Sequence, residues 1–328
     1  MIKSAIYLIG ICLMLTGCEQ RSLPSQQIHL ANQGLLSADL ASSGKLALVS
    51  SLGQGTVVWD LEQGKERWRW RQSDDQEEFV TLTRFSPDDS HAITATQHTF
   101  AIWRLQDGRS QGYYSLPESR LRDAAISADG RQVLIGREDG KAEVVDTQTG
   151  RRLQFLGHTE QVNTVDLSPN GRYALTGGND YSAYLWDTRT GQVVWRFNHA
   201  GRVVMARLDP SGRFAFTADS RQASIWDLKT GKEHSRLQYD HRFEVYTSAR
   251  FANGGNWLIT GAPSRQLTLW QVSDGQPLQS WRVSPHPKVK PPSAVVYGVA
   301  LRDNDHLVSA SSSGLAEIWT IKKGSKGP

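Results

Sequence analysis

A Trp-Asp pair, or a close variant of it, recurs along the chain at steps of 40 to 49 residues. Six of the seven copies keep the tryptophan and four keep the aspartate. The copies start at Trp59, Trp103, Val145, Trp186, Trp226, Trp270 and Trp319. A repeat of this period indicates one structural unit used several times, in which each unit packs on its neighbours and not around one central core.

The most complete unit runs from Gly157 to Asp187 and contains three stretches in which apolar and polar residues alternate. These stretches are Gln161–Leu167, Tyr173–Thr176 and Ser182–Trp186, separated by turns rich in Gly, Pro, Asn and Asp. Alternation with a period of two between such turns predicts short antiparallel strands with one half-buried face. No run with a helical period exceeds a few turns, so the pattern predicts an all-β protein.

The Gly157-His158 pair that opens this unit, the Trp-Asp pair that closes it and the whole ladder of repeats resemble the WD40 family over residues 27–321. The resemblance implies a seven-bladed β-propeller in which each blade is a four-stranded sheet. It also implies a structural hydrogen-bonded set in the fourth unit, made of His158, Thr176, Asp180 and Trp186. The other units carry only part of this set, for example His199, Thr217 and Trp226 in the fifth.

The two ends of the repeat array predict how the ring closes. The seventh unit ends after its third predicted strand, Leu315–Ile321, whereas a spare strand, Gln27–Ala31, precedes the first unit. Pairing these two strands completes the seventh blade and removes an unpaired strand edge. We therefore expect the N-terminal strand to close the seventh blade.

The first residues predict a location. Lys3 precedes an apolar run, Ala5–Leu15, which is too short to span a bilayer and typical of a signal peptide over residues 1–17. The run ends in Leu15-Thr16-Gly17-Cys18, which resembles a bacterial lipobox and implies lipidation of Cys18. An ordinary signal peptide with a chance cysteine and a cytosolic chain with an apolar N-terminus are the alternatives.

Residues 18–26 read as a lipidated tether and residues 322–328 as a disordered basic tail. The residue after Cys18 is Glu19 and not aspartate. In lipoproteins of the kind that the lipobox implies, this favours the outer membrane, facing the periplasm, over the inner membrane.

One face of the expected propeller gathers basic residues. The family's strand order places the loops between units and the turns between second and third strands on the same face. That face holds His158 and His241 and the residues expected to bind a partner, which are Arg120, Arg137, Arg202, Arg221, Arg242, Arg265, His286, Lys288 and Lys290. It also holds the acidic Asp74, Asp75, Glu77 and Glu78.

We expect an acidic envelope protein to bind near the basic side, with the proline-rich loop 283–293 contributing. The alternative is a solvated surface of mixed charge. A second candidate surface is KERWRWR at residues 65–71. There Trp68 and Trp70 either pack on the next blade or form an exposed binding patch with the arginines.

The sequence carries no motif for a cofactor, a metal or a catalytic residue. Asp303-Asn304-Asp305 lies where a hairpin turn is required, so a calcium site there is disfavoured. The net charge is only +4, from 37 basic and 33 acidic residues that are scattered along the chain, and this does not predict nucleic-acid binding.

Two classes of function remain. The WD40 resemblance implies a non-catalytic scaffold for protein–protein interaction, either a monomer or part of a complex. Residues 63–70 and 190–197 also resemble quinoprotein-type propellers, one of which is a lipoprotein of the outer-membrane barrel assembly machinery. The alternative is therefore a propeller enzyme or a quinoprotein-like assembly protein, but the clear Trp-Asp pairs favour the scaffold.

Overall fold

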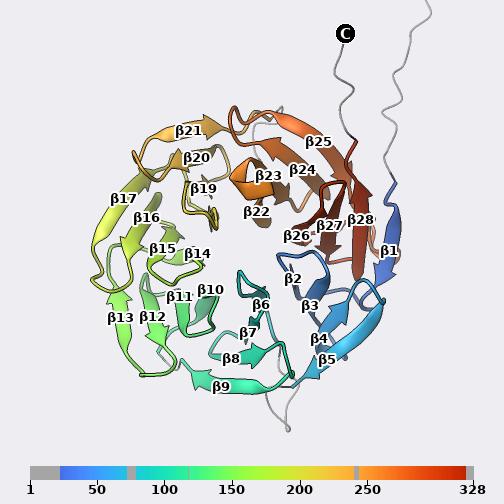
Figure 1. Ribbon diagram of the computed structural model, residues 1–328, viewed down its shortest axis with the longest axis horizontal. Coiled ribbons are helices and arrows are strands. Elements are labelled where there is room, and N and C mark those ends of the chain that lie inside the picture. Colours follow the sequence, from blue (N-terminus) through green and yellow to red (C-terminus); the bar gives the residue numbers. More distant parts are fainter. Residues whose placement is uncertain (1–22, 72–78, 117, 240–243, 323–328) are drawn as a thin grey trace, which may run out of the picture.

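A computed structural model describes residues 23–71, 79–116, 118–239 and 244–322. The described residues form seven four-stranded antiparallel sheets arranged as blades around a central channel (Figure 1). The all-β, seven-bladed fold expected from the repeat is therefore confirmed. The predicted targeting segment, Cys18 and most of the basic tail lie outside the described residues.

The strands follow the chain blade by blade. Blade 1 contains β2 (Ser37–Leu40), β3 (Leu46–Ser51), β4 (Gly55–Asp60) and β5 (Lys65–Trp70). Blade 2 contains β6 (Leu82–Phe85), β7 (His91–Ala95), β8 (Thr99–Arg104) and β9 (Ser110–Ser115). Blade 3 contains β10 (Leu121–Ile126), β11 (Gln132–Arg137), β12 (Ala142–Asp146) and β13 (Arg152–Phe155). Blades 4 and 5 contain β14 (Val162–Leu167), β15 (Tyr173–Gly178), β16 (Ser182–Asp187) and β17 (Val193–Asn198), then β18 (Met205–Leu208), β19 (Phe214–Ala218), β20 (Ala223–Asp227) and β21 (Glu233–Arg236). Blade 6 contains β22 (Ser248–Ala252), β23 (Trp257–Gly261), β24 (Gln266–Gln271) and β25 (Pro277–Arg282), with a short 3-10 turn at Asn253–Gly255.

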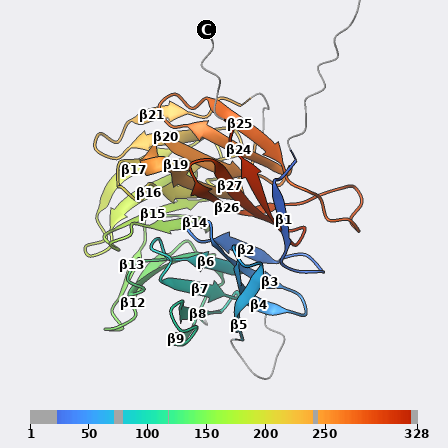
Figure 2. The same ribbon diagram turned by 45° about the vertical axis from the view of Figure 1, so that its right-hand side comes forward.

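Blade 7 combines the two ends of the chain. Its strands are β26 (Val296–Asp303), β27 (His306–Ser311), β28 (Leu315–Thr320) and β1 (Gln26–His29). β1 pairs antiparallel with β28, and Figure 2 shows it at the outer edge of this blade. The predicted closure by the N-terminal strand is confirmed.

The closing segment also fills the junction between blades 7 and 1. Leu30 is 1% exposed and Ile28 is 7% exposed, and both pack with apolar residues of the two blades. The backbone N–H of Leu30 donates to the carbonyl of Gly314 at 2.8 Å. The segment therefore contributes both strand pairing and apolar burial where the first and last blades meet.

The other clusters of buried apolar residues also lie between neighbouring blades. A ring from the outer strand of one blade often stacks on the third-strand tryptophan of the next. Trp70 stacks on Trp103 with ring centroids 4.6 Å apart, and Trp68 Nε1 donates to the carbonyl of Leu105 at 3.3 Å. The interpretation of Trp68 and Trp70 as blade-packing residues is confirmed, and the alternative of an exposed tryptophan patch is wrong.

The alternating strand directions give the propeller two different faces. The connection face carries the links between blades and the turns between second and third strands. The hairpin face carries the turns between first and second and between third and fourth strands. β1 runs antiparallel to β28, so the chain enters β1 from the hairpin face. The chain also leaves β28 there, since the N–H of Ile321 donates to the carbonyl of Asp305 in a hairpin-face turn.

Candidate functional site

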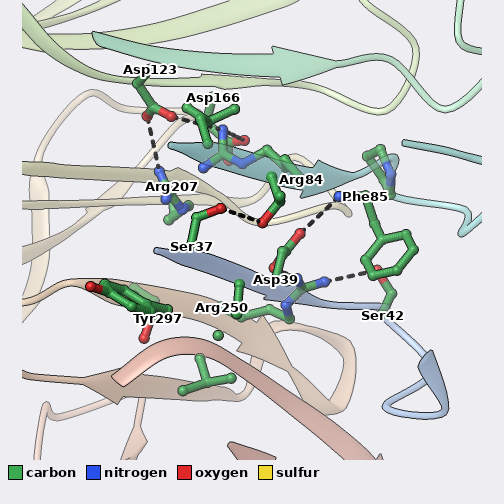
Figure 3. Close-up of a pocket in the computed structure, with 18 of the residues that line it drawn as sticks. Ser37, Asp39, Ser42, Arg84, Phe85, Asp123, Asp166, Arg207, Arg250 and Tyr297 are labelled. Atoms are coloured by element: carbon green, nitrogen blue, oxygen red, sulfur yellow. Dashed lines mark hydrogen bonds and ion pairs between the residues drawn. The ribbon is translucent and has the colours of Figure 1, made fainter. Parts of the chain in front are cut away.

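The innermost strands surround a cavity of about 240 Å³ at the centre of the ring (Figure 3). Polar side chains from blades 1 to 6 project into it, and Tyr297 of β26 lines it from blade 7. Its charged residues are Asp39, Arg84, Asp123, Asp166, Arg207 and Arg250. Three carboxylates therefore face three guanidinium groups in one confined space.

Each carboxylate holds the innermost strand of the next blade. Asp39 accepts a hydrogen bond from the backbone N–H of Phe85 at 2.8 Å. Asp123 does the same for Val165 at 2.8 Å, and Asp166 accepts from the N–H of Leu208 at 2.7 Å. These bonds supply partners for strand-edge donors that would otherwise face the channel.

Two of the arginines reach across a blade. Blades 3 and 7 have Ala125 and Ala300 at the strand position where the other blades carry a charged residue. Arg84 of blade 2 extends past Ala125, and its Nη1 donates to the carbonyls of Ala124 and Val165, each at 2.9 Å. The small side chain of blade 3 thus leaves room for Arg84 to link blades 2, 3 and 4.

Arg250 makes the corresponding link past blade 7. Its Nη2 donates to Asp39 Oδ1 at 2.9 Å and to the carbonyl of Leu40 at 2.7 Å, and its Nη1 donates to Ser42 at 3.0 Å. Gly298 allows this approach of blades 7 and 1, because a Cβ there would lie 3.2 Å from Asp39 Cα. Three hydrogen bonds therefore hold Arg250 in a structural contact between blades 6 and 1.

Arg207 lies in blade 5, and the next blade has Arg250 and not alanine at this strand position. The Arg207 side chain therefore does not cross a blade and lines the channel. Its Nη1 donates to the carbonyl of Ala206 at 2.7 Å and to Thr164 Oγ1 at 3.3 Å. Its nearest carboxylate oxygen belongs to Asp123, at 3.9 Å, and Arg84 lies at the same distance from that side chain. Burial and the positive charge of Arg84 lower the pKa of Arg207 to about 10.

Sequence reasoning missed this charged cluster. For five of its six charged residues the signal was a single charged residue in the first strand, just before the first hairpin turn, as in Ala38-Asp39-Leu40 and Ala206-Arg207-Leu208. Asp123 lies two residues before that position, which Ala125 occupies in blade 3. The pattern can be read from the sequence, but it does not show which of these charges lie close together. That depends on how the blades are placed around the channel. No search for a catalytic or metal motif detects it.

Three of the four residues of the expected hydrogen-bonded set lie in contact. Nδ1 of His158 donates to Asp180 Oδ1 at 3.0 Å, and Nε2 lies 2.9 Å from Oγ1 of Thr176. Burial disfavours the charge of Asp180, but the hydrogen bond from His158 and backbone N–H groups outweigh it and lower its pKa. Trp186 differs from the expectation, because within the described residues nothing accepts a hydrogen bond from its buried Nε1.

Blade 5 contains a more connected version of the same network. Trp226 Nε1 donates to Thr217 Oγ1 at 2.6 Å, and that oxygen lies 2.8 Å from His199 Nε2. Asp219, which sequence reasoning missed, places a carboxylate oxygen 3.6 Å from His199 Nδ1. Burial lowers the pKa of His199 more than Asp219 raises it. Both networks are buried between strands, as structural supports are.

The basic residues predicted on the connection face differ in their exposure. Arg120, Arg202, Arg221, Lys288 and Lys290 are exposed, whereas Arg265 and His286 are half-buried. Arg265 Nε donates to the carbonyl of Val283 at 2.8 Å. Residues 72–78 and 240–243 lie outside the described residues, and with them Asp74, Asp75, Glu77, Glu78, His241 and Arg242.

Arg137 requires a correction. Its side chain is 4% exposed and lies 2.8 Å from Asp139, 3.3 Å from Glu118 and 3.4 Å from the buried Glu143. The three carboxylates compensate the positive charge of this guanidinium, and its side chain is buried in the blade. Arg137 therefore does not belong to a partner-binding surface.

The same face exposes large apolar side chains that sequence reasoning did not single out. Their exposed fractions lie between 41% and 69%, and they are Leu52, Phe79, Leu156, Tyr181, Val245 and Val289. All six lie in inter-blade links or second-to-third-strand turns. The connection face therefore combines exposed apolar groups with exposed arginine and lysine.

Tyr181 adopts a left-handed backbone conformation, with φ of +62°. Blades 3 and 7 have glycine in the corresponding turn, Gly140 with φ of +83° and Gly314 with φ of +88°. A side chain in this region of the backbone map is strained, and such strain gathers at functional sites. The Tyr181 ring is nevertheless 51% exposed, so burial does not account for its presence.

Other kinds of site find less support in the structure. Within the described ranges no group of three or more His, Cys, Asp or Glu side chains could hold a metal ion. Asp303 binds the N–H of Asp305 and the ring of His306 in a hairpin-face turn. The described part of the chain also contains no helix long and apolar enough to span a membrane.

Comparisons with known proteins agree with this architecture. Residues 150–187 match the family model "WD domain, G-beta repeat". The chain is 32% identical over 139 residues to the WD repeat-containing protein SL1-17 of Schistosoma mansoni, which covers 41% of this chain and 44% of that protein. It is 27% identical over 100 residues to the small ribosomal subunit protein RACK1 of Drosophila melanogaster, covering 30% of this chain and 31% of that protein.

A third relative is autophagy-related protein 16 of Arabidopsis thaliana, 28% identical over 136 residues, which covers 41% of this chain and 26% of that protein. The match thus spans less than half the length of each of these relatives. Seven four-stranded blades around one channel make the described residues a seven-bladed β-propeller, and these matches show that its repeats are similar to WD40 repeats.

Proposed function

We propose that this protein is a non-catalytic scaffold whose connection face binds a protein partner. The observation that carries the proposal is the coincidence, on one face, of six exposed apolar side chains with exposed basic residues. Exposed apolar groups bordered by polar ones are typical of interaction sites on soluble folds. The WD-repeat relatives favour the same class of function.

The chemistry of the face suggests an acidic partner with apolar anchors. Around blades 4 and 5, Tyr181 and Leu156 lie on the same face as the exposed Arg202 and Arg221. Tyrosine and arginine are the residue types that most often dominate binding energy at interfaces. The proline-rich loop 283–293 adds Lys288 and Lys290 at the link between blades 6 and 7.

The strained Tyr181 offers a specific test of function. Replacing it by glycine, Tyr181→Gly, removes the exposed ring and supplies the residue that blades 3 and 7 use in this turn. We expect the melting temperature to stay unchanged or to rise, while affinity for the partner falls. A fall in stability without a change in affinity would give the ring a structural role.

The partner must first be captured by crosslinking in intact cells, followed by purification through a tag on this protein. We expect the double charge reversal Arg202→Glu/Arg221→Glu to weaken binding of that partner roughly tenfold or more, because like charges then face each other. The matched control is Arg189→Glu/Lys229→Glu, which makes the same change on the hairpin face of the same two blades. Equal effects of both pairs would contradict binding at the connection face.

Deleting the segment Pro285–Pro292 tests the contribution of the proline-rich loop. We expect weaker capture of the same partner at a nearly unchanged melting temperature, because the loop lies outside the strand ladders. Undiminished capture would remove the loop from the proposed surface.

We further propose that a lipid on Cys18 anchors this scaffold in the bacterial envelope, in the outer membrane facing the periplasm. The support is the lipobox-like sequence, and the strand topology adds an orientation. The chain enters β1 from the hairpin face, and the seven steps from Cys18 to Ser25 span at most about 23–25 Å. The hairpin face would then lie toward the bilayer, leaving the connection face open to the periplasm.

Fractionation of Cys18→Ser tests the anchor. We expect this variant in the soluble periplasmic fraction or as an unprocessed precursor, because it lacks the cysteine that would carry the acyl groups. Two or more acyl groups give firm membrane attachment, whereas one gives only marginal attachment. A mature-sized variant that stays with the membranes would contradict lipid anchoring. For orientation, Lys229→Cys should react with a bulky maleimide more slowly than Arg221→Cys on reconstituted vesicles, and equal rates would contradict the proposed orientation.

A further inference from the structure

The central cavity contains a guanidinium whose hydrogen-bonding capacity is only partly used. Arg207 has five N–H donors, and its hydrogen bonds to Ala206 and Thr164 use only Nη1. Within the described residues no hydrogen bond engages its Nε or Nη2. Its side chain is 18% exposed, so these donors retain contact with the cavity (Figure 3).

The carboxylates near Arg207 are committed elsewhere. Asp123 Oδ2 accepts from the N–H of Val165 at 2.8 Å and Oδ1 accepts from the N–H of Ala124 at 2.9 Å. Asp166 Oδ2 is held by the N–H of Leu208 at 2.7 Å. At 3.9 Å, Asp123 offers Arg207 electrostatic attraction without a hydrogen bond.

Arg84 adds a second positive charge to the same side of the cavity. It lies 3.9 Å from both Asp123 and Asp166, and its hydrogen bonds also use only Nη1. Although burial opposes the charge of Arg84, the carboxylates of Asp123, Asp166 and Asp39 outweigh it and raise its pKa. Both arginines therefore stay charged at neutral pH, and the fork of Arg207 has unused donors beside a second cation.

Arg250 is more firmly held than Arg207 in the same cavity. Its two Nη atoms have three hydrogen bonds, one of them to the carboxylate of Asp39 at 2.9 Å. Arg207 lacks such a carboxylate at hydrogen-bond distance. Arg84 also lacks a carboxylate at hydrogen-bond distance, but its Nη1 links the carbonyls of blades 3 and 4, each at 2.9 Å. Arg207 has only the carbonyl of its neighbour Ala206 at 2.7 Å and the hydroxyl of Thr164 at 3.3 Å. Arg207 is therefore the least firmly held of the three arginines and the position where an additional oxyanion would be stabilised.

We propose that the central channel binds a small oxyanion, a phosphate or a carboxylate, through the Nε and Nη2 donors of Arg207, with Arg84 as a flanking charge. The planar fork of a guanidinium matches two oxygens of either group. A cavity of about 240 Å³ has room for such a group together with water. This site lies inside the ring and is independent of partner binding at the connection face.

Calorimetric titration of the purified protein with inorganic phosphate and, separately, with acetate tests the site. The titrations are run at constant ionic strength adjusted with sodium chloride, since general screening must not be mistaken for binding. We expect saturable binding of at least one of the two anions to the wild type, and at least about tenfold weaker binding to Arg207→Gln. Arg202→Gln is the matched control, because it removes an exposed arginine outside the channel and should bind like the wild type.

Thermal melting separates anion binding from a structural role of Arg207. In chloride alone we expect Arg207→Gln to melt at or above the wild-type temperature, because the substitution removes a cation crowded by Arg84. Phosphate should raise the melting temperature of the wild type and not that of the variant. If Arg207→Gln folds poorly, Arg207→Lys, which keeps the charge but not the fork, should retain the fold and bind the anion more weakly.

The source of the oxyanion is distinguished by a third titration with an acidic peptide of six glutamates. Tighter binding of the peptide than of acetate, lost in Arg207→Gln, would indicate a carboxylate carried into the channel by a partner chain. Preference for phosphate over both would indicate a free phosphate compound. Absence of saturable binding for all three probes, or equal binding to wild type and Arg207→Gln, would overturn the proposal.

Discussion

Substituting Leu30 tests whether the N-terminal segment holds the ring closed. Leu30 is 1% exposed and packs in the apolar cluster shared by blades 7 and 1. Truncating such a leucine, Leu30→Ala, removes buried methyl groups and leaves a cavity, so the free energy of unfolding should fall by about 2–5 kcal/mol. The matched control is Leu23→Ala, the same substitution at a residue of the same segment that is 84% exposed, which should change it by less than about 0.5 kcal/mol.

Urea and thermal unfolding followed by tryptophan fluorescence provide the measurement, on protein that lacks the lipid. At about 2–4 °C per kcal/mol for domains of 150–250 residues, a loss of about 2–5 kcal/mol lowers the melting temperature by roughly 4–20 °C, and in this longer chain we expect the lower part of that range for Leu30→Ala. A chain that starts at Gln33 removes β1 altogether and should melt lower still or aggregate, because the edge of β28 becomes unpaired.

Equal melting temperatures for Leu30→Ala and Leu23→Ala would refute this reasoning, because the closing segment would then contribute no packing energy. Equal protease resistance of the chains starting at Leu23 and at Gln33 would show that the ring closes without β1.

Two further predictions concern the buried polar networks. Thr217→Val leaves the Trp226 indole N–H and the His199 ring nitrogen without their shared partner, so it should cost about 1–3 kcal/mol of unfolding free energy in urea, whereas exposed Thr159→Val should be neutral. Because the folded-state pKa of Asp180 lies below its unfolded value, the stability it contributes is complete above that unfolded value of about 3.9 and is lost as the pH falls through the folded pKa. Unfolding measured between about pH 5 and pH 2 should therefore depend less steeply on pH in Asp180→Asn than in the wild type, and parallel curves would contradict a lowered pKa of Asp180.

The number of blades and the manner of closure were predictable because they depend on local and periodic information. Period-two alternation, turn sequences and the recurring Trp-Asp pair each specify a strand or a turn within a few residues. Counting the units left the seventh blade one strand short and the N-terminus with one strand to spare. Pairing the spare strand with the last strand satisfies the backbone N–H and C=O groups of both, and the structure has this β1–β28 pairing.

The roles of individual charged residues were less predictable. Arg137 follows the same strand-and-turn pattern as exposed arginines, yet its side chain is buried and forms ion pairs with Glu118, Asp139 and Glu143. Trp186 belongs to the most complete repeat, yet its indole N–H is unpaired among the described residues, while the Trp226 indole is bonded. Side-chain geometry at the level of an ångström decides these contacts, and a repeat pattern does not specify it.

By itself, the sequence determined the all-β class, the seven blades and the closing strand, because strand periodicity and turn chemistry act over short stretches of chain. Only the tertiary structure decided which charges meet in the channel. Asp39, Arg84, Asp123 and Arg207 come from different blades, and Arg84 crosses blade 3 only because Ala125 is small. Electrostatic partners are set by distance in space and not by separation in sequence. The unused donors of Arg207 can therefore be recognised only from the positions of the blades around the channel.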